Sequence, residues 1–439
     1  MKWSYRSVIL AGLLGMLLAG WVANRSSFSA NNDAYLQVLA ADGFRDGSGY
    51  GFHQNGEFIS ISARTMMSRW PPGLTALAAG LAKLGRDPLV SIVSIYPVLI
   101  LATYLVLAWS LAGYLGAALA CWTAFGALTP WCVMTYHSKL STEPFALLFA
   151  AVLFALILQR KPTQTGSLVG RVVLFVVAAV GLTMFRNAGA YLVVVGVPLF
   201  VWFHGAGIWP RLRLAIVMGL CSLLPLMTFH WIAKAQSMKV APPAKGGAGT
   251  GILSQLNGNL EVFAEALVPR ISFLDARHSN LAAAIGWGLV LFVAASGVRE
   301  LARRKWDLEP REDGDGLRVV MVGLALALAC VVMLAVSADQ FGYDWSSVYR
   351  VKGFALPWII AAFASGLVLL TAKNPTLRPL VMAVIILTSS ARFMYAWRAP
   401  LPDLIIPLCA VDYRGATDKM LQAVAAPARR TRNGRWRSG

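Results

Sequence analysis

Long apolar runs alternate with short polar connections along most of the chain. Eleven such runs recur between Val8 and Phe393, and they contain almost no charged residues. A bilayer core needs about 20 mostly apolar residues per helical span, so each run predicts a membrane-spanning helix. The runs lie near residues 8–23, 89–110, 113–134, 144–158, 172–185, 188–203, 214–232, 281–298, 319–337, 354–371 and 379–391. The second and third runs form one continuous block, which its length divides near Gly113 and Gly116.

The first long segment between apolar runs covers residues 31–86. Its pattern predicts a short helix over 33–42 and a glycine-rich loop over 43–57. A second helix is predicted from Leu74 to Gly85. At about 12 residues, or roughly 18 Å, it is too short to cross a bilayer, so it is expected to lie in the interface plane.

Residues 233–280 form the other large outer segment. Four apolar residues at helical spacing predict an amphipathic helix there: Leu256, Leu260, Phe263 and Leu267. This helix would turn Glu261 and Glu265 away from its apolar side. The whole pattern predicts an all-α polytopic membrane protein, with a transmembrane domain over 1–394 and a basic tail over 395–439.

Composition supports a membrane protein. Hydrophobic residues make up 57% of the chain and charged residues 13%, and the mean hydropathy is +0.62. A net charge of +19 would suggest nucleic acid as the partner of a soluble protein. Here the basic residues lie mainly between spans, where they face anionic membrane lipids and set orientation, so no nucleic acid is expected. With a cytoplasmic N-terminus, 299–318 becomes a solvated cytoplasmic loop, and the side of the basic tail stays open.

Cysteines and the N-terminus add two further expectations. The five cysteines include no CxxC pair, so neither a disulfide framework nor a zinc site is predicted. Met1 to Ala23 has the pattern of a signal peptide, with Lys2 and Arg6 before an apolar run. A retained first span is favoured, because no small-x-small cleavage site stands out at its end.

Ionisable residues avoid the predicted spans. The stretch from Leu89 to Tyr136 contains no Asp, Glu, Lys or Arg. The outer ends of the spans collect such groups instead: Asp33, His137, Lys139, Glu143, Arg186, Asp339, Asp344, Arg350 and Lys352. Ion-coupled transporters keep charges near the bilayer midplane. The pattern here favours chemistry at one membrane surface, on a substrate whose lipid tail stays in the bilayer.

Five motifs, in this order and spacing, resemble the GT-C glycosyltransferase superfamily. They are Asn31-Asn32-Asp33-Ala34-Tyr35-Leu36, Trp70-Pro71-Pro72-Gly73-Leu74, Ser141-Thr142-Glu143-Pro144-Phe145, Phe185-Arg186-Asn187-Ala188-Gly189 and Tyr349-Arg350. The chain looks most like the bacterial members akin to protein O-mannosyltransferases and aminoarabinose transferases. The likeness is good over residues 1–205 and thin beyond them.

This resemblance implies an inverting transferase in the inner (cytoplasmic) membrane that uses a polyprenyl-phosphate sugar on the periplasmic side. An acid of the first outer loop is the catalytic residue of the family, and Asp33 is the position that matches. Many relatives have two adjacent acids here, whereas Ala34 follows Asp33 in this chain. One carboxylate is chemically sufficient. A lipid phosphate leaves as a stable anion, so a single general base on the acceptor hydroxyl can serve.

The remaining candidates divide by chemistry. Arg186 and Arg350 are the expected phosphate ligands, because a guanidinium grips phosphate oxygens through two donors. Further candidates for the phosphate are Lys352, Lys139 and His137. Glu143 and Asp42 could contact the acceptor or a metal. The metal requirement is left open, with Mg or Mn as the divalent cations to consider.

Each assignment has an alternative. Asp33 could cap the helix that follows it, Arg186 and Arg350 could anchor to headgroups, and Glu143 could complement the dipole at the start of a span. A transporter or flippase of lipid-linked saccharide, or a non-catalytic membrane scaffold, would share the same spans. The sequence leaves the sugar and its acceptor undetermined.

Overall fold

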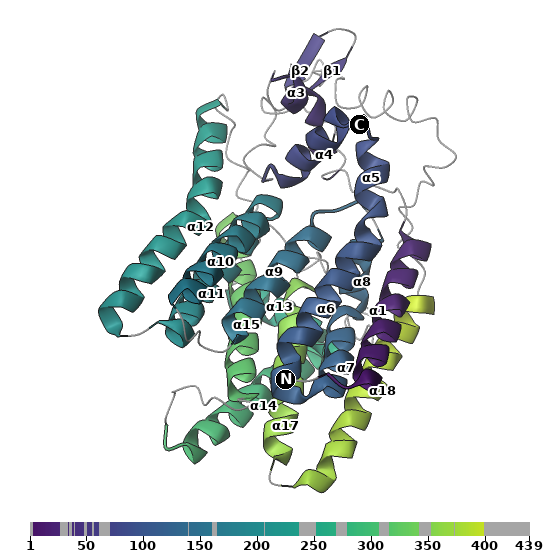
Figure 1. Cartoon of the computed structure of the whole chain (residues 1–439), viewed down its shortest axis with the longest axis vertical. Helices are drawn as coiled ribbons and strands as arrows, with labels where there is room; N and C mark the ends of the chain where they lie inside the picture. The colour runs from purple at the N-terminus through teal and green to yellow at the C-terminus, as the bar shows by residue number, and fades with distance from the viewer. Residues whose placement is uncertain are drawn as a thin grey trace, which may run out of the picture.

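The computed structural model describes most of the chain (Figure 1). It covers residues 3–26, 34, 37–38, 40–47, 51–54, 57–60, 71–138, 140–159, 165–205, 207–236, 252–268, 279–306, 316–341, 353–372 and 374–398. Only the backbone is described at 42, 44, 51–54, 57–60, 165–166, 232–236, 252–253, 279, 337–341 and 375.

A bundle of long helices forms the body of the protein, as the apolar runs predicted. Its principal helices are α1 (Tyr5–Arg25), α5 (Pro88–Ser94), α6 (Tyr96–Leu115), α7 (Ala117–Leu128), α8 (Trp131–Met134), α9 (Glu143–Leu158), α10 (Thr165–Phe185), α11 (Gly189–His204), α12 (Ile208–Gln236), α14 (Ser279–Arg303), α15 (Gly316–Phe341), α17 (Leu356–Thr371) and α18 (Arg378–Arg398). Short 3-10 turns adjoin several of them: η2 (Thr135–His137), η7 (Gly353–Ala355) and η8 (Pro375–Leu377). Every predicted run falls on one to three of these elements.

Eight of the described helices are long and apolar enough to cross a membrane. A ninth span results if α7 is joined to the segment Trp131–His137, from which it is bent by 73°. The helices α9 and α11 have 16 residues each, or about 24 Å, and are shorter than a bilayer core. The predicted division of the second and third runs is confirmed at Gly116, whose φ of 81° suits glycine and separates α6 from α7.

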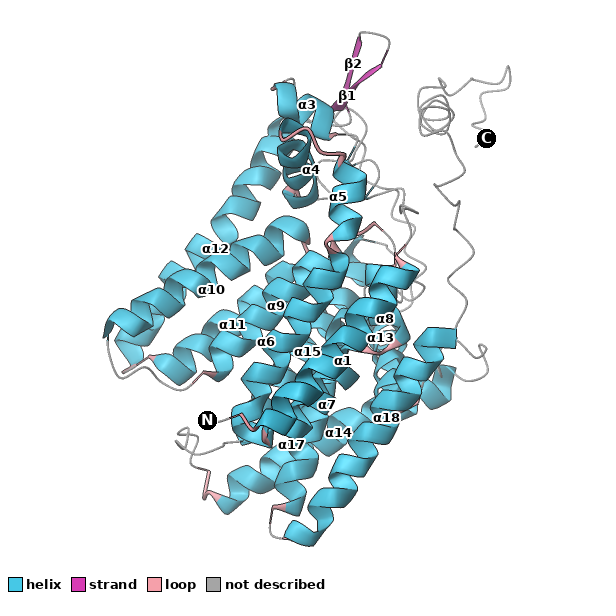
Figure 2. Cartoon of the chain, turned by 45° about the vertical axis from the view of Figure 1, so that its right-hand side comes forward, coloured by secondary structure: helices cyan, strands magenta, loops and turns pink. Residues whose placement is uncertain are grey.

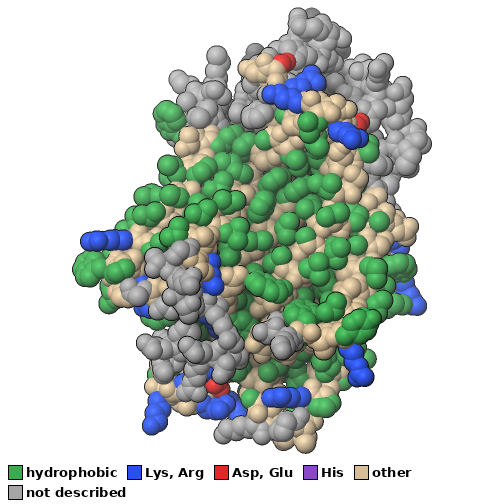
Figure 3. Space-filling model, in the orientation of Figure 1, with side chains coloured by type: hydrophobic (Ala, Val, Ile, Leu, Met, Phe, Trp, Pro, Cys, Tyr) green, Lys and Arg blue, Asp and Glu red, His purple; other side chains and the backbone are tan. Residues whose placement is uncertain are grey.

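The outer surface of the bundle is apolar (Figure 3). Large side chains such as Trp209, Trp231 and Leu220 are well exposed on α12, while Trp21 and Trp358 are fully buried inside the bundle. An apolar surface of this extent would aggregate in water, whereas lipid chains cover it without cost. The protein is therefore a multi-pass membrane protein.

One end of the bundle carries a small extramembrane cap, here called the hairpin end (Figure 2). The cap consists of α3 (Ala41–Asp46), the antiparallel strands β1 (Gly51–Gln54) and β2 (Glu57–Ser60), and α4 (Gly73–Lys83). The short helix predicted after Leu74 is confirmed as α4. The loop predicted over 43–57 is wrong, because α3 continues through Gly43 to a left-handed cap at Gly47 and a hairpin follows. Asn55-Gly56, between the strands, is the dipeptide that favours two-residue hairpin turns.

The second outer segment also differs from its prediction. Its helix α13 (Ile252–Leu260) and the turn η3 (Glu261–Ala266) pack against α14, α15 and α17. Glu261 and Glu265 are only 7% and 1% exposed, so the expectation that they turn toward water is wrong. Helical spacing shows which residues share a face, but it does not show that neighbouring helices cover both faces.

The end opposite the hairpin, the far end, is less solvated than its charge suggested. Arg304 and Arg318 are buried, although 299–318 was predicted to be a solvated loop. Arg318 donates to the Ile157 carbonyl, and His204 Nε2 lies 3.0 Å from the Leu156 carbonyl oxygen. These side chains satisfy the last carbonyls of the short helix α9, which ends inside the bundle where water is scarce.

Candidate functional site

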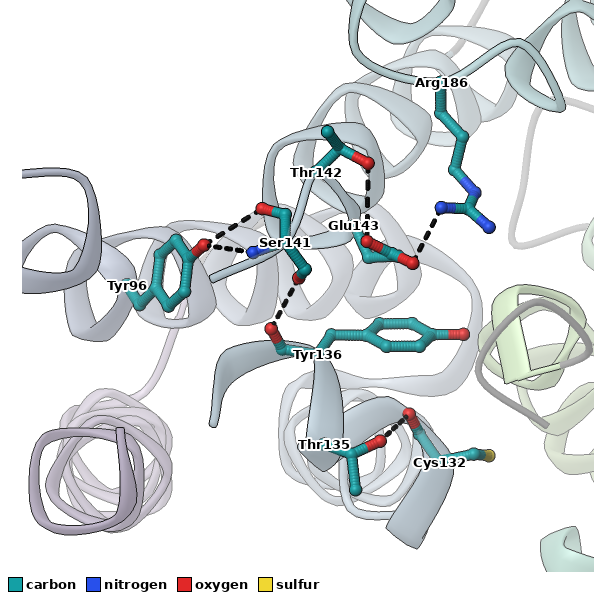
Figure 4. Close-up of polar contacts among 8 residues, drawn as sticks. All are labelled: Tyr96, Cys132, Thr135, Tyr136, Ser141, Thr142, Glu143 and Arg186. Atoms are coloured by element: carbon teal, nitrogen blue, oxygen red, sulfur yellow. Dashed lines mark hydrogen bonds and ion pairs between the residues drawn. The ribbon is translucent and has the colours of Figure 1, made fainter. Parts of the chain in front are cut away.

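A buried ion pair lies at the hairpin end, between two of the motifs found in the sequence. Arg186 Nη1 lies 2.7 Å from Glu143 Oε1, and the side chains are 15% and 2% exposed (Figure 4). Glu143 is the first residue of α9, where the helix dipole favours an acid. Arg186 directly follows the last residue of α10, where the dipole favours a cation. The site therefore places an arginine in a largely dry setting, held by one carboxylate.

The residues before Glu143 form a fixed hydrogen-bonded support. Thr142 Oγ1 donates to Glu143 Oε2 at 3.3 Å. Tyr96 Oη donates to the Ser141 carbonyl and accepts from the Ser141 amide, each at 2.9 Å. Ser141 Oγ donates to the Tyr136 carbonyl at 2.9 Å. These bonds join α6, η2 and the start of α9, so the carboxylate is positioned before any ligand binds.

The first outer loop packs directly onto α10, the helix that Arg186 follows. A Cβ at Gly73 would lie 2.5 Å from the Met184 carbonyl oxygen, two residues before Arg186, so this contact requires glycine. Thr75 Oγ1 donates to the Gln37 carbonyl at 2.8 Å, which ties α4 to a residue four positions after Asp33. The Trp70–Leu74 motif thus contacts the end of α10 through Gly73.

The chain that follows the Tyr349-Arg350 motif packs beside this region at η7. Gly353 is the first described residue after Arg350 and Lys352. A Cβ there would lie 2.7 Å from Tyr136 Oη and 2.8 Å from Cys132 Sγ. In Figure 4 the Tyr136 ring extends below the Glu143 side chain. Close packing of Gly353 against α8 and η2 therefore fixes the position of the chain directly after the segment that contains Arg350.

Beneath Cys132 lies a buried charged cluster that the sequence reading missed. Cys132 Sγ donates to Glu265 Oε2 at 3.2 Å. Arg392 donates to the Ala266 carbonyl and to Ser389 Oγ, and the charge of Glu265 acts on it. The predicted last span stopped at residue 391, whereas α18 continues to Arg398 and includes Arg392, which is 3% exposed. The expectation of spans without buried charge is wrong at this position.

The other predicted site residues have mixed outcomes. Asp33, Lys139, Arg350 and Lys352 lie outside the described residues, and only the backbone of Asp42 is described, within α3. His137 is fully buried in η2, edge-on to Tyr96 with ring centroids 6.2 Å apart. No side chain of the described residues bonds to its ring nitrogens.

Two observations bear on metal and on further positioning groups. Within the described ranges, no three His, Cys, Asp or Glu residues lie close enough to hold a metal ion. Glu143, one of the two acids considered for that role, is held by Arg186. His230 Nε2 of α12 lies 3.3 Å from Oδ1 of Asn187, the residue after Arg186. Sequence alone gave no signal for His230, because it lies 43 positions from its partner.

Comparisons with known proteins give structural similarity only. No protein-family model and no curated protein matches the sequence. The fold is similar to ArnT from Cupriavidus metallidurans bound to undecaprenyl phosphate, at 14% identity and a TM-score of 0.37, covering 85% of this chain and 79% of ArnT. The apo state of the same ArnT gives 12% identity and a TM-score of 0.35, covering 88% and 77%.

An archaeal oligosaccharyltransferase is also similar. The enzyme from Archaeoglobus fulgidus, crystallised with Zn and sulfate, gives 10% identity and a TM-score of 0.45, covering 88% of this chain and 52% of that chain. TM-scores and identities this low assign no residue a role.

Proposed function

We propose that this protein is a glycosyltransferase that takes a sugar from a polyprenyl-phosphate carrier. The observation that carries the proposal is the convergence of separate motifs on the Glu143–Arg186 ion pair at the hairpin end. The acceptor is an envelope lipid, polysaccharide or protein. The active face is the periplasmic side of the inner membrane.

Arg186 is suited to hold the donor phosphate. A guanidinium has five N–H donors, and the ion pair with Glu143 engages Nη1. The remaining donors suit two oxygens of a phosphate, and the dry surroundings strengthen each charge-assisted bond. Glu143 keeps the guanidinium in one orientation, so little side-chain entropy is lost when phosphate binds.

Asp33 supplies the base in this proposal. It takes the proton from the acceptor hydroxyl as the oxygen attacks the anomeric carbon. The bond from that carbon to the phosphate oxygen breaks, and the electron pair leaves with the lipid phosphate. The developing negative charge needs cations rather than an acid, and Arg186, with Arg350 and Lys352 before Gly353, supplies them.

The test is mass spectrometry of envelope glycolipids and polysaccharides at matched membrane levels of the protein. Cells carry the native chain, no gene, Asp33→Asn, Arg186→Lys or Asp87→Asn. Asp87→Asn is the matched control, because Asp87 caps α5 at the end of the same loop and Asn caps equally well. A sugar missing from the deletion and the Asp33→Asn strain, reduced with Arg186→Lys and normal in the control, is the expected result.

Other outcomes separate the alternatives. If the deletion alone loses the sugar, Asp33 is a helix cap and the chemistry lies elsewhere. If no strain changes, the enzyme proposal fails in favour of a scaffold. Lipid-linked sugar that accumulates only on the cytoplasmic side of the membrane in the deletion strain would indicate a flippase.

A further inference from the structure

At the far end of the bundle, α14 and α17 touch and then separate. A Cβ at Gly366 would lie 2.7 Å from Ser296 Oγ, so the two helices are in close contact at that level. One turn further along α14 a pocket opens between them. Its lining comprises Ser296, Arg299, Glu300 and Arg303 of α14 with Leu369 and Leu370 of α17.

The two walls of this pocket have different chemistry. Arg299 and Arg303 are four residues apart, so they lie on one face of α14, and both are exposed. Glu300 binds Arg303 Nη1 at 2.9 Å and Arg304 Nε at 3.1 Å, so one acid faces two cations. Arg299 makes no ion pair with the described residues, which leaves this wall with a net positive charge.

The chain just after α14 adds a separate observation. Lys305 and Trp306 both have positive φ, 52° and 66°, a conformation that residues other than glycine rarely adopt. Trp306 remains 65% exposed. Exposed tryptophan beside basic residues is typical of the membrane–water interface. The end of α14 that lines the pocket therefore has the residue pattern of the membrane–water interface.

We propose that this pocket binds an anionic phospholipid. Arg299 and Arg303 contact the headgroup phosphate, and Leu369 and Leu370 contact the first part of an acyl chain. Free phosphate would use the arginines but leave the leucine wall exposed. Basic pockets between spans are where anionic headgroups bind.

The experiment measures binding of phosphatidylglycerol to the purified full-length chain by native mass spectrometry. Phosphatidylcholine and inorganic phosphate serve as comparison probes. Arg299→Gln with Arg303→Gln is expected to weaken phosphatidylglycerol binding about tenfold, since each cation near an anionic lipid contributes to its attraction. Arg299→Gln alone, at an exposed position without an ion pair, tests the same point without disturbing the fold.

The matched control removes two exposed arginines at the same end, with Arg213→Gln and Arg378→Gln. Unchanged binding in this control and failure of inorganic phosphate to compete support the lipid site. Equal losses in both double variants would show that diffuse charge attracts the lipid. Competition by inorganic phosphate at similar concentration would show that the pocket recognises phosphate alone. Either of these two results overturns the proposal.

Discussion

The ion pair between Glu143 and Arg186 gives the sharpest prediction. With 2.7 Å between Nη1 and Oε1, the gross attraction is about 6 kcal/mol at an effective dielectric constant of about 20. Removing one partner of a buried pair costs about 3–5 kcal/mol, because the other charge stays desolvated. Arg186 is 15% exposed and can recover some hydration, whereas Glu143 at 2% cannot. Arg186→Met should therefore destabilise the protein by about 3 kcal/mol, and Glu143→Gln by about 2 kcal/mol.

The assay is a double-mutant cycle on the free energy of unfolding, followed by tryptophan fluorescence during denaturant titration in detergent. The double variant should lose less than the sum of the single losses, with a coupling of about 1.5–3 kcal/mol. Single effects that add to within about 0.5 kcal/mol would refute the reasoning. In that case the two side chains touch, but their contact does not contribute to the free energy of unfolding. Arg186→Lys should retain most of the stability while raising the KM for the donor, because lysine keeps the charge but loses the two-pronged grip.

Three further changes test the packing around the site. Gly353→Ala should lower the free energy of unfolding by about 1–3 kcal/mol through its clashes with Tyr136 and Cys132, and an unchanged free energy of unfolding would contradict the geometry. Thr75→Val removes the donor to the Gln37 carbonyl and should lower the free energy of unfolding by about 1–2 kcal/mol, measured as a lower unfolding midpoint. An unchanged midpoint would show that this bond does not hold α4 in place. Arg392→Met should lower the free energy of unfolding by about 3–5 kcal/mol, because it removes the cation near the buried acid Glu265. Arg392→Lys should have a smaller effect. A loss below about 1 kcal/mol with Arg392→Met would mean that Glu265 is neutral.

The spans were predictable because lipid imposes a simple rule. Each helix that crosses the bilayer must satisfy its backbone internally and present apolar side chains outward, and both demands are met by residues adjacent in sequence. Even the division of a continuous apolar block was visible at Gly116, where positive φ suits glycine. Glu143 and Arg186 were identifiable as candidates because charged residues at span ends are conspicuous against an apolar background.

The site itself depends on contacts across the chain. Nothing in the sequence pairs Glu143 with Arg186, 43 positions away, rather than with a metal or an acceptor. Gly73 was visible only as part of the Trp70–Leu74 motif, and its contact with Met184 shows why a larger residue does not fit.

Burial of polar groups was the least predictable property. Glu265 and Arg392 lie far apart in the chain, and each is buried because the other's charge and neighbouring polar atoms compensate the lost hydration. Periodicity assigned Glu265 to an outward face, since a single helix cannot reveal what packs against its polar side. The sequence by itself determined the membrane and the apolar helices, although it predicted eleven spans where eight or nine of the described helices are long enough to cross. The tertiary structure decided which charges meet, because pairing energy depends on distances between residues that only folding brings together.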